Sequence, residues 1–284
     1  MKSVNHLSIK GLMSAVFLTA LVGCVSQPTN NTSTAKSDES SAGLSAGLSA
    51  LGNALGVSPS ATAAAMDLAK AATVTDAEVK SSSLQYRQYE ATQVKIASSG
   101  NKYGARLARL TSRHTNEDGL KLNFKAILDP SVNANATADG SVRVYSGLMD
   151  LMNDQELLGV IGHEIGHVKL GHTLSKTRSA LLASATRKAA ASSSNVAGLL
   201  AKSELGGFGE KLFNSQFSQS AETESDDYGL AFMKKHKYNV KAMESAFRKL
   251  AAGGAQGDAM SNMLSSHPDP AKRADRMRDL ASAQ

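Results

Sequence analysis

Residues 163–167 read His-Glu-Ile-Gly-His, a spacing that can hold a metal ion on one face of an α-helix. Side chains four residues apart lie about one turn apart on the same helix face, so His163 and His167 can bind one zinc ion together. Glu164 follows the first histidine, and its carboxylate can reach a metal-bound water and take its proton. The pattern predicts a site with one Zn²⁺ per chain and Glu164 as the catalytic general base.

A catalytic zinc site takes three protein ligands and leaves a fourth position for water. His172 is one candidate for the third ligand, because it lies five residues after His167. The extended metzincin pattern requires glycine at 170 and histidine at 173, whereas residues 170–172 read Leu-Gly-His. We therefore expect His172 to end the helix, where a partly charged imidazole suits the C-terminal dipole.

Residues 222–229, Glu-Thr-Glu-Ser-Asp-Asp-Tyr-Gly, offer a better candidate. Glu222 and Asp226 are four residues apart, so one carboxylate can bind zinc while the other accepts a hydrogen bond from a ligand imidazole. Glu224 points to another helix face and is a rival ligand. Without a metal, the same residues would be an acidic first turn stabilised by the helix dipole.

Helical signals surround these motifs. A capping box that begins at Thr75 predicts a helix to about Ile96, and a second helix is expected over residues 103–113. Asn153 with Glu156 marks the start of the long apolar helix that carries the histidines.

Alternating apolar residues predict strands near residues 120–128, 132–138 and 142–145, the last two on either side of an Asp-Gly turn. The expected fold class is therefore α+β, dominated by helices, with a small antiparallel sheet of about three strands.

The N-terminus predicts export and a lipid anchor. Lys2 and Lys10 form a positively charged segment before a short apolar run over residues 12–22, which is typical of a signal peptide, and Cys24 is the only cysteine. The segment before Cys24 resembles a bacterial lipobox, which implies an acylated Cys24. Val25 after the cysteine implies the outer membrane, with the folded part facing the periplasm.

We expect three parts: a signal peptide (residues 1–23), the acylated cysteine with a flexible Ser-, Gly- and Ala-rich tether (24–60), and a peptidase domain (61–284). The 284 residues are 42% hydrophobic and 20% charged, which excludes a multi-span membrane protein and a wholly disordered chain. The net charge of +6 is weak and dispersed, so no nucleic-acid partner is expected.

Residues 156–172, 222–226 and 267–273 together resemble the zinc metallopeptidase family that includes HtpX, the CAAX prenyl proteases and the bacterial lipoproteins BepA and LoiP. The resemblance covers about residues 85–280. It is closest to the lipoprotein members, because no TPR-type repeat or multi-helix membrane part is visible. It implies a zincin-type, gluzincin-like domain with Glu222 as the third ligand and Asp226 as the partner of a ligand.

The resemblance also implies further site residues. It makes Asn133, Ala134, Asn135 and Ala136 part of an edge strand beside the cleft, where an unfolded substrate can pair its backbone. It brings His267 and Arg273 to the active site, His267 as a fourth ligand or an oxyanion donor and Arg273 as the partner of an acidic group. His267 before proline is otherwise ordinary turn punctuation. Ser225 stands where alanine is usual, and Asn135 where an aromatic residue is common.

Two functions follow as hypotheses. The first is a membrane-anchored zinc endopeptidase that hydrolyses unfolded or misfolded envelope proteins. The second is a periplasmic holdase or outer-membrane assembly factor with a latent or structural zinc. A zinc ion held by four protein ligands favours the holdase or assembly factor, whereas a zinc ion with one position open to water favours the endopeptidase. Residues 174–204 are expected to be helical, either as a lid over the cleft or as a plain surface helix.

Overall fold

The computed structural model describes residues 73–190, 205–253 and 261–283, all within the compact unit Leu44–Gln284. Cys24, the predicted signal peptide and the tether over residues 24–60 lie outside the described residues. None of the described helices is long and apolar enough to span a bilayer.

The described strands are β1 (Asn123–Ile127), β2 (Ala134–Ala136) and β3 (Ser141–Tyr145). The described helices are α3 (Asp76–Gln93), α4 (Lys102–Thr111), the 3-10 helix η1 (Ser112–His114), α5 (Ser146–Leu151), α6 (Asp154–Lys169), α7 (His172–Ala190), α8 (Leu205–Asn214), α9 (Gln219–Lys235), α10 (Lys241–Gly253), α11 (Ser261–Ser266) and α12 (Pro270–Ser282). The helix-dominated α+β fold class is confirmed.

The sheet is mixed, which corrects the expectation of an antiparallel one. Its order is β1-β3-β2, with β3 parallel to β1 and antiparallel to β2. The turn at Gly140, which has a φ of +86°, joins β2 and β3 as neighbours, and β3 then lies between β2 and β1. Alternation of apolar residues identifies strands but carries no information about their direction, which explains the error. β2 is left at an edge of the sheet.

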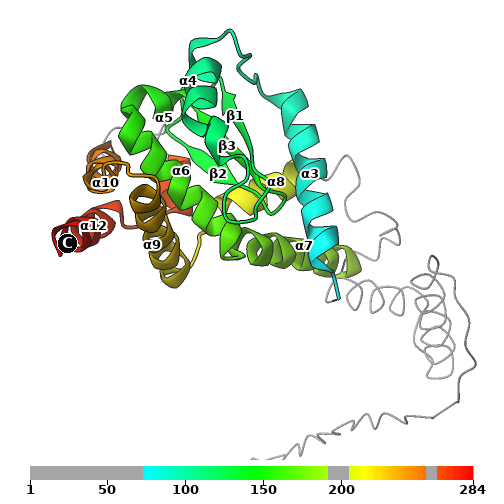
Figure 1. The fold of residues 1–284 in the computed structure, drawn as a ribbon. Coiled ribbons are helices and arrows are strands. Elements are labelled where there is room, and N and C mark those ends of the chain that lie inside the picture. Colours follow the sequence, from blue (N-terminus) through cyan, green and yellow to red (C-terminus); the bar gives the residue numbers. More distant parts are fainter. Residues whose placement is uncertain (1–72, 191–204, 254–260, 284) are drawn as a thin grey trace, which may run out of the picture. The chain divides into compact units, whose positions relative to one another are not determined.

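Helix α6 is the central element of the domain (Figure 1), and it contacts β2, β3, α7, α9 and α10. Its start is the predicted capping box. Asn153 Oδ1 accepts hydrogen bonds from the backbone N–H groups of Gln155 and Glu156, while Glu156 Oε2 accepts one from the N–H of Asn153 at 2.8 Å. Every residue from 156 to 167 is buried. This stretch is buried on all sides, so both histidines of the motif lie inside the domain.

The end of α6 differs from the expectation. The helix stops at Lys169, Gly171 adopts a left-handed φ of +77°, and His172 is the first residue of α7. Glycine has no Cβ to oppose this conformation, so the chain turns here and starts a new helix. His172 therefore does not end α6. The turn directs its imidazole back towards the motif, as the contacts below describe.

Helix α9 approaches α6 closely, as Figure 1 also shows. Gly229 of α9 makes this possible, because a Cβ at that position would lie 3.1 Å from the backbone nitrogen of His163. Gly162 of α6 serves the same contact, because its Cβ would lie 2.8 Å from the ring of Phe232. Small residues thus set the distance between the two helices that carry the candidate ligands.

Candidate metal centre

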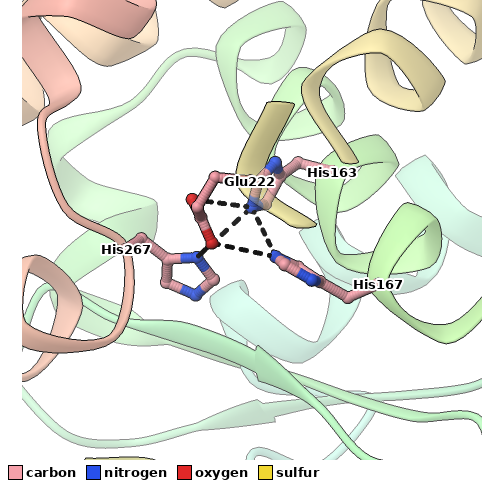
Figure 2. A group of neighbouring side chains, drawn as sticks. All are labelled: His163, His167, Glu222 and His267. Carbon is pink, nitrogen blue, oxygen red and sulfur yellow. Dashed lines mark hydrogen bonds and ion pairs between the residues drawn. The ribbon is translucent and has the colours of Figure 1, made fainter. Parts of the chain in front are cut away.

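Four buried side chains from three parts of the fold converge on one point (Figure 2). His163 and His167 come from α6, Glu222 from α9 and His267 from the turn before α12, and their ligand atoms lie within 4.8 Å of one another. The Nε2 atoms of His163 and His167 are 3.0 Å apart. Glu222 Oε1 lies 3.3 Å from His167 Nε2, and Glu222 Oε2 lies 3.7 Å from His163 Nε2.

The donor set fits zinc. Burial and the neighbouring imidazole of His163 hold the pKa of His167 well below its ordinary value, so this imidazole is neutral and keeps a lone pair. Burial alone would raise the pKa of Glu222, but His267 and His167 lower it far below the ordinary value, so the carboxylate is ionised. Two imidazole nitrogens and one carboxylate oxygen, all converging in a buried site, are a common zinc ligand set in hydrolases.

Asp226 lies behind His163. Its Oδ1 is 2.9 Å from His163 Nδ1, which leaves Nε2 of that ring for a metal. Arg273 donates to both oxygens of Asp226 at 2.9 and 2.6 Å, and its Nη1 is 2.7 Å from Glu222 Oε2. Burial would raise the pKa of Asp226, but the guanidinium of Arg273 and the hydrogen bond to His163 lower it. One arginine therefore contacts both Glu222 and Asp226 of α9.

His172 lies behind the second ligand, a contact that sequence reasoning missed. Its Nδ1 is 3.2 Å from His167 Nδ1, and its Nε2 is 3.1 Å from Glu224 Oε2. The proton of His172 Nε2 is donated to Glu224, so Nδ1 is free to accept the proton of His167 Nδ1. The Ser225 hydroxyl is also 3.1 Å from His172 Nδ1. Glu224, the rival ligand, thus contacts His172 rather than the converging group.

Glu164 and His267 face each other across the centre. Glu164 Oε1 is buried and accepts no hydrogen bond within the described ranges, and His267 Nε2 is 3.6 Å from it. His267 Nδ1 is 2.9 Å from Glu222 Oε1 and 3.3 Å from His163 Nε2. His267 is 3% exposed, so it is part of the site rather than an exposed turn residue.

A cavity of about 90 Å³ adjoins Glu164 and His267. Its lining combines the β2 edge with α7 and the α8–α9 connection: Asn133, Asn135, Ala136, Tyr145, Glu164, Thr173, Lys176, Thr177, Leu212, Phe217, Ser266 and His267. Ala134, also in β2, is fully buried. Helix α7 therefore forms a wall of the cavity, while residues 191–204 of the predicted lid segment lie outside the described part.

Phe217 is a second residue that the sequence did not reveal. Its ring stacks on His167 with the centroids 3.8 Å apart and the planes at 20°. The backbone N–H of Phe217 donates to the Ser266 carbonyl, next to His267. No motif marks an aromatic residue in a connection, so only its position in space indicates a role.

A second group of metal-binding residue types, His114, Glu117 and His236, is explained by hydrogen bonds. Glu117 lies 3.0 Å from both His114 Nδ1 and His236 Nε2, and Lys235 pairs with it at 2.5 Å. Tyr238 contacts the remaining nitrogen of His114 at 2.9 Å. Both histidines and Glu117 therefore have hydrogen-bonding or charged partners, so this cluster needs no cation.

Comparison with known proteins adds independent evidence. Residues 101–281 match the model of peptidase family M48. Metalloprotease LoiP of Escherichia coli K12 is 41% identical over 215 residues, which cover 75% of this chain and 84% of that protein. Metalloprotease YcaL of the same organism is 39% identical over 211 residues, with coverage of 74% and 82%. A putative beta-barrel assembly-enhancing protease of Vibrio cholerae is 28% identical over 188 residues, with coverage of 64% and 39%.

Proposed function

The chain belongs to peptidase family M48 and is a metallopeptidase, and from this premise we propose that it is a zinc endopeptidase acting on unfolded or misfolded proteins of the cell envelope. The family confirms the resemblance predicted from the sequence motifs. The observation that carries the proposal is a buried set of His163, His167 and Glu222 beside Glu164, whose Oε1 accepts no hydrogen bond from the described residues.

The ligands are His163, His167 and Glu222, in a gluzincin-like arrangement around the His-Glu-x-x-His motif. Zinc in this place would supply Lewis-acid polarisation of the scissile carbonyl and of the attacking water. Asp226 and His172 fix the ring orientation of the two histidines, and Arg273 fixes Asp226.

Glu164 moves the proton. Its Oε1, which accepts no hydrogen bond from the described residues, takes a proton from water as the water attacks the scissile carbonyl, and the same oxygen then delivers that proton to the leaving amine nitrogen. The burial of Glu164 excludes bulk water from this transfer, since the residue is 1% exposed.

The substrate is an extended chain lying along β2. Asn133 Oδ1 supports this proposal, because it is a buried acceptor beside the cavity without a hydrogen bond in the described part of the chain. A backbone N–H of the substrate can supply that bond. Pairing with a strand edge is nearly independent of sequence, which suits the removal of unfolded proteins.

The membrane location is also a proposal. It rests on the lipobox-like segment before Cys24, and it makes residues 1–23 a signal peptide, 24–60 a tether and 61–284 the peptidase domain. The lipid on Cys24 would hold the enzyme on the periplasmic face of the outer membrane.

A holdase or assembly factor is the second candidate. Two observations favour it: His267 offers a fourth ligand, which can make the zinc latent, and the Vibrio cholerae relative is described as assembly-enhancing. In that case the outer-membrane assembly machinery is the partner, and hydrolysis is a minor activity.

Digestion of casein by the purified chain separates the two candidates. A zinc endopeptidase digests casein, loses this activity with a chelator and regains it with added zinc. Zinc content of each preparation should be measured beside the digestion. No digestion at full zinc occupancy, together with suppression of casein aggregation, would support the holdase and contradict the endopeptidase.

A further inference from the structure

The cavity beside the metal centre contains a cation that the proposed mechanism does not use. Lys176 lies one turn into α7, and Thr173 and Thr177 line the same cavity from the same helix face. Glu164 and His267 line it from the other side. The ammonium group therefore borders the space that a substrate side chain next to the scissile bond must enter.

Lys176 is held in place by an aromatic ring. Its Nζ lies 4.0 Å from the centre of the Phe217 ring, and Phe217 in turn stacks on His167. A cation over a ring face is attracted by it, but the ring supplies no negative charge to neutralise the ammonium. The contact fixes the position of the charge relative to the ligands.

No carboxylate is paired with this charge in the described part of the chain. Glu164 and Glu222 are the acidic groups that influence the pKa of Lys176. Glu164 forms its ion pair with His267, however, and Glu222 forms one with Arg273. Burial lowers the pKa of Lys176 to about 8, and the two carboxylates oppose this decrease. Within the described residues the ammonium form of this side chain has no paired carboxylate, and a buried charge without a partner is costly unless a ligand supplies one.

The chemistry of the substrate limits what that ligand can be. A polypeptide has two kinds of carboxylate, the side chains of aspartate and glutamate and the free C-terminus. The cavity has a volume of about 90 Å³, so a small group such as a carboxylate suits it. Lysine recognises a carboxylate as a point charge, and a partly buried site strengthens that attraction.

We propose that Lys176 is a specificity-determining residue whose ammonium binds a substrate carboxylate in the cavity beside Glu164. This inference rests on the proposed peptidase function. It makes the enzyme selective for peptide bonds near an acidic residue or near a free C-terminus, while the β2 edge binds the backbone without regard to sequence.

The test uses the purified full-length chain and quenched fluorescent peptides that differ at one position near the scissile bond, with glutamate, glutamine or lysine there. A second pair carries a free or an amidated C-terminus close to the bond. The wild type should cleave one carboxylate peptide with a kcat/KM roughly tenfold above its neutral counterpart. The pair that shows the preference identifies the source of the carboxylate.

Variants then assign the preference to Lys176. Lys176→Met should bring the kcat/KM ratio of the carboxylate peptide to its neutral counterpart close to one. Lys176→Glu should reverse the preference in favour of the lysine peptide. Lys80→Met, on the exposed face of α3, is the matched control and should keep the ratio. A ratio near one in the wild type, a ratio that survives Lys176→Met, or an equal loss on all peptides would overturn the proposal.

A binding measurement keeps this test separate from the proposed function. In the Glu164→Gln background, the Kd for the uncleaved carboxylate peptide should be lower than for the neutral one, and Lys176→Met should abolish the difference. Equal Kd values would overturn the role of Lys176 even if catalysis is intact. Selective binding without any hydrolysis by the wild type would instead contradict the endopeptidase.

Discussion

The two ligand histidines are oriented by different chemical groups. His163 is hydrogen-bonded to a carboxylate that an arginine holds from behind, whereas His167 is hydrogen-bonded to a second imidazole that ends at an exposed carboxylate. Both arrangements put the proton on Nδ1 and leave Nε2 for the metal. Each arrangement ends at a carboxylate, Asp226 or Glu224, which can only accept a hydrogen bond. The carboxylate therefore fixes which ring nitrogen carries the proton.

The His172 contact can be tested through zinc affinity. His172→Leu should weaken zinc binding by about 10–100-fold, because His167 loses the acceptor that fixes its ring. His172→Asn offers an amide oxygen as an acceptor and should recover part of the affinity. Competition with a fluorescent chelator measures both. Equal affinity in the wild type and His172→Leu would show that the metal alone orients His167.

Glu164→Gln should keep zinc and the fold but lose hydrolysis by about 10²–10⁴-fold, because glutamine cannot accept the proton. Metal content, circular dichroism and peptide cleavage should be measured on one preparation. If the zinc is lost together with the activity, Glu164 is a ligand and not the base.

His267→Ala should raise basal cleavage. The imidazole lies 2.9 Å from Glu222 and 3.6 Å from Glu164, and in that position it occupies the space between a ligand and the base. Steady-state cleavage of an unfolded protein at equal zinc occupancy measures the effect. A decrease of about 10²–10³-fold would assign His267 to the oxyanion instead, and unchanged activity would leave it as a turn residue.

At the scale of elements, the site depends on how closely two helices approach. Helix α6 supplies two ligands and the base, and α9 supplies Glu222 and Asp226. Their spacing is set by Gly229 and Gly162, which lack the atoms that would push the helices apart. A shift of α9 relative to α6 by a few tenths of an ångström therefore moves Glu222 relative to His163 and His167.

Gly229→Val should therefore destabilise the fold by about 1–3 kcal/mol and weaken zinc binding, because the new side chain overlaps the backbone of α6. Gly207→Val on α8 is the matched control, since a Cβ at that position has no neighbour within 4 Å. Urea denaturation and zinc titration measure the two effects. Equal stability of both variants would show that α9 can move without cost.

At the scale of the whole molecule, the proposed lipid anchor and the proposed catalytic centre are separate functions. The residues that form the centre lie between 133 and 273, and the lipobox-like segment ends at Cys24. None of the described helices can serve as a membrane span. The proposed attachment rests on Cys24, which lies outside the described part of the chain.

Cys24→Ala should release the chain from the membrane fraction while leaving peptidase activity in solution unchanged, because the tether contributes location and no chemistry. Cell fractionation followed by a peptide assay of the soluble pool checks both statements. A variant that stays membrane-bound after a high-salt wash would show that another surface anchors the protein.

The local features of the fold follow from the sequence alone. The capping box at Asn153 and the apolar run after it specified helix α6, and the spacing of His163 and His167 specified which face they share. Motif order was enough to identify the family, which the comparison confirms. These features depend on neighbours within about one or two turns, so local periodicity contains them.

Contacts between residues that are distant in the sequence depend on the tertiary structure. It brought Glu222 to the histidines and Glu224 to His172, gave β1 and β3 a parallel direction, and brought Lys176 and Phe217 to the cavity. Periodicity states which residues share a face, but it does not state which faces of distant helices and strands pack together. That choice is made by close packing at the glycines of the α6–α9 contact, and by the left-handed φ of Gly171, which turns the chain between α6 and α7.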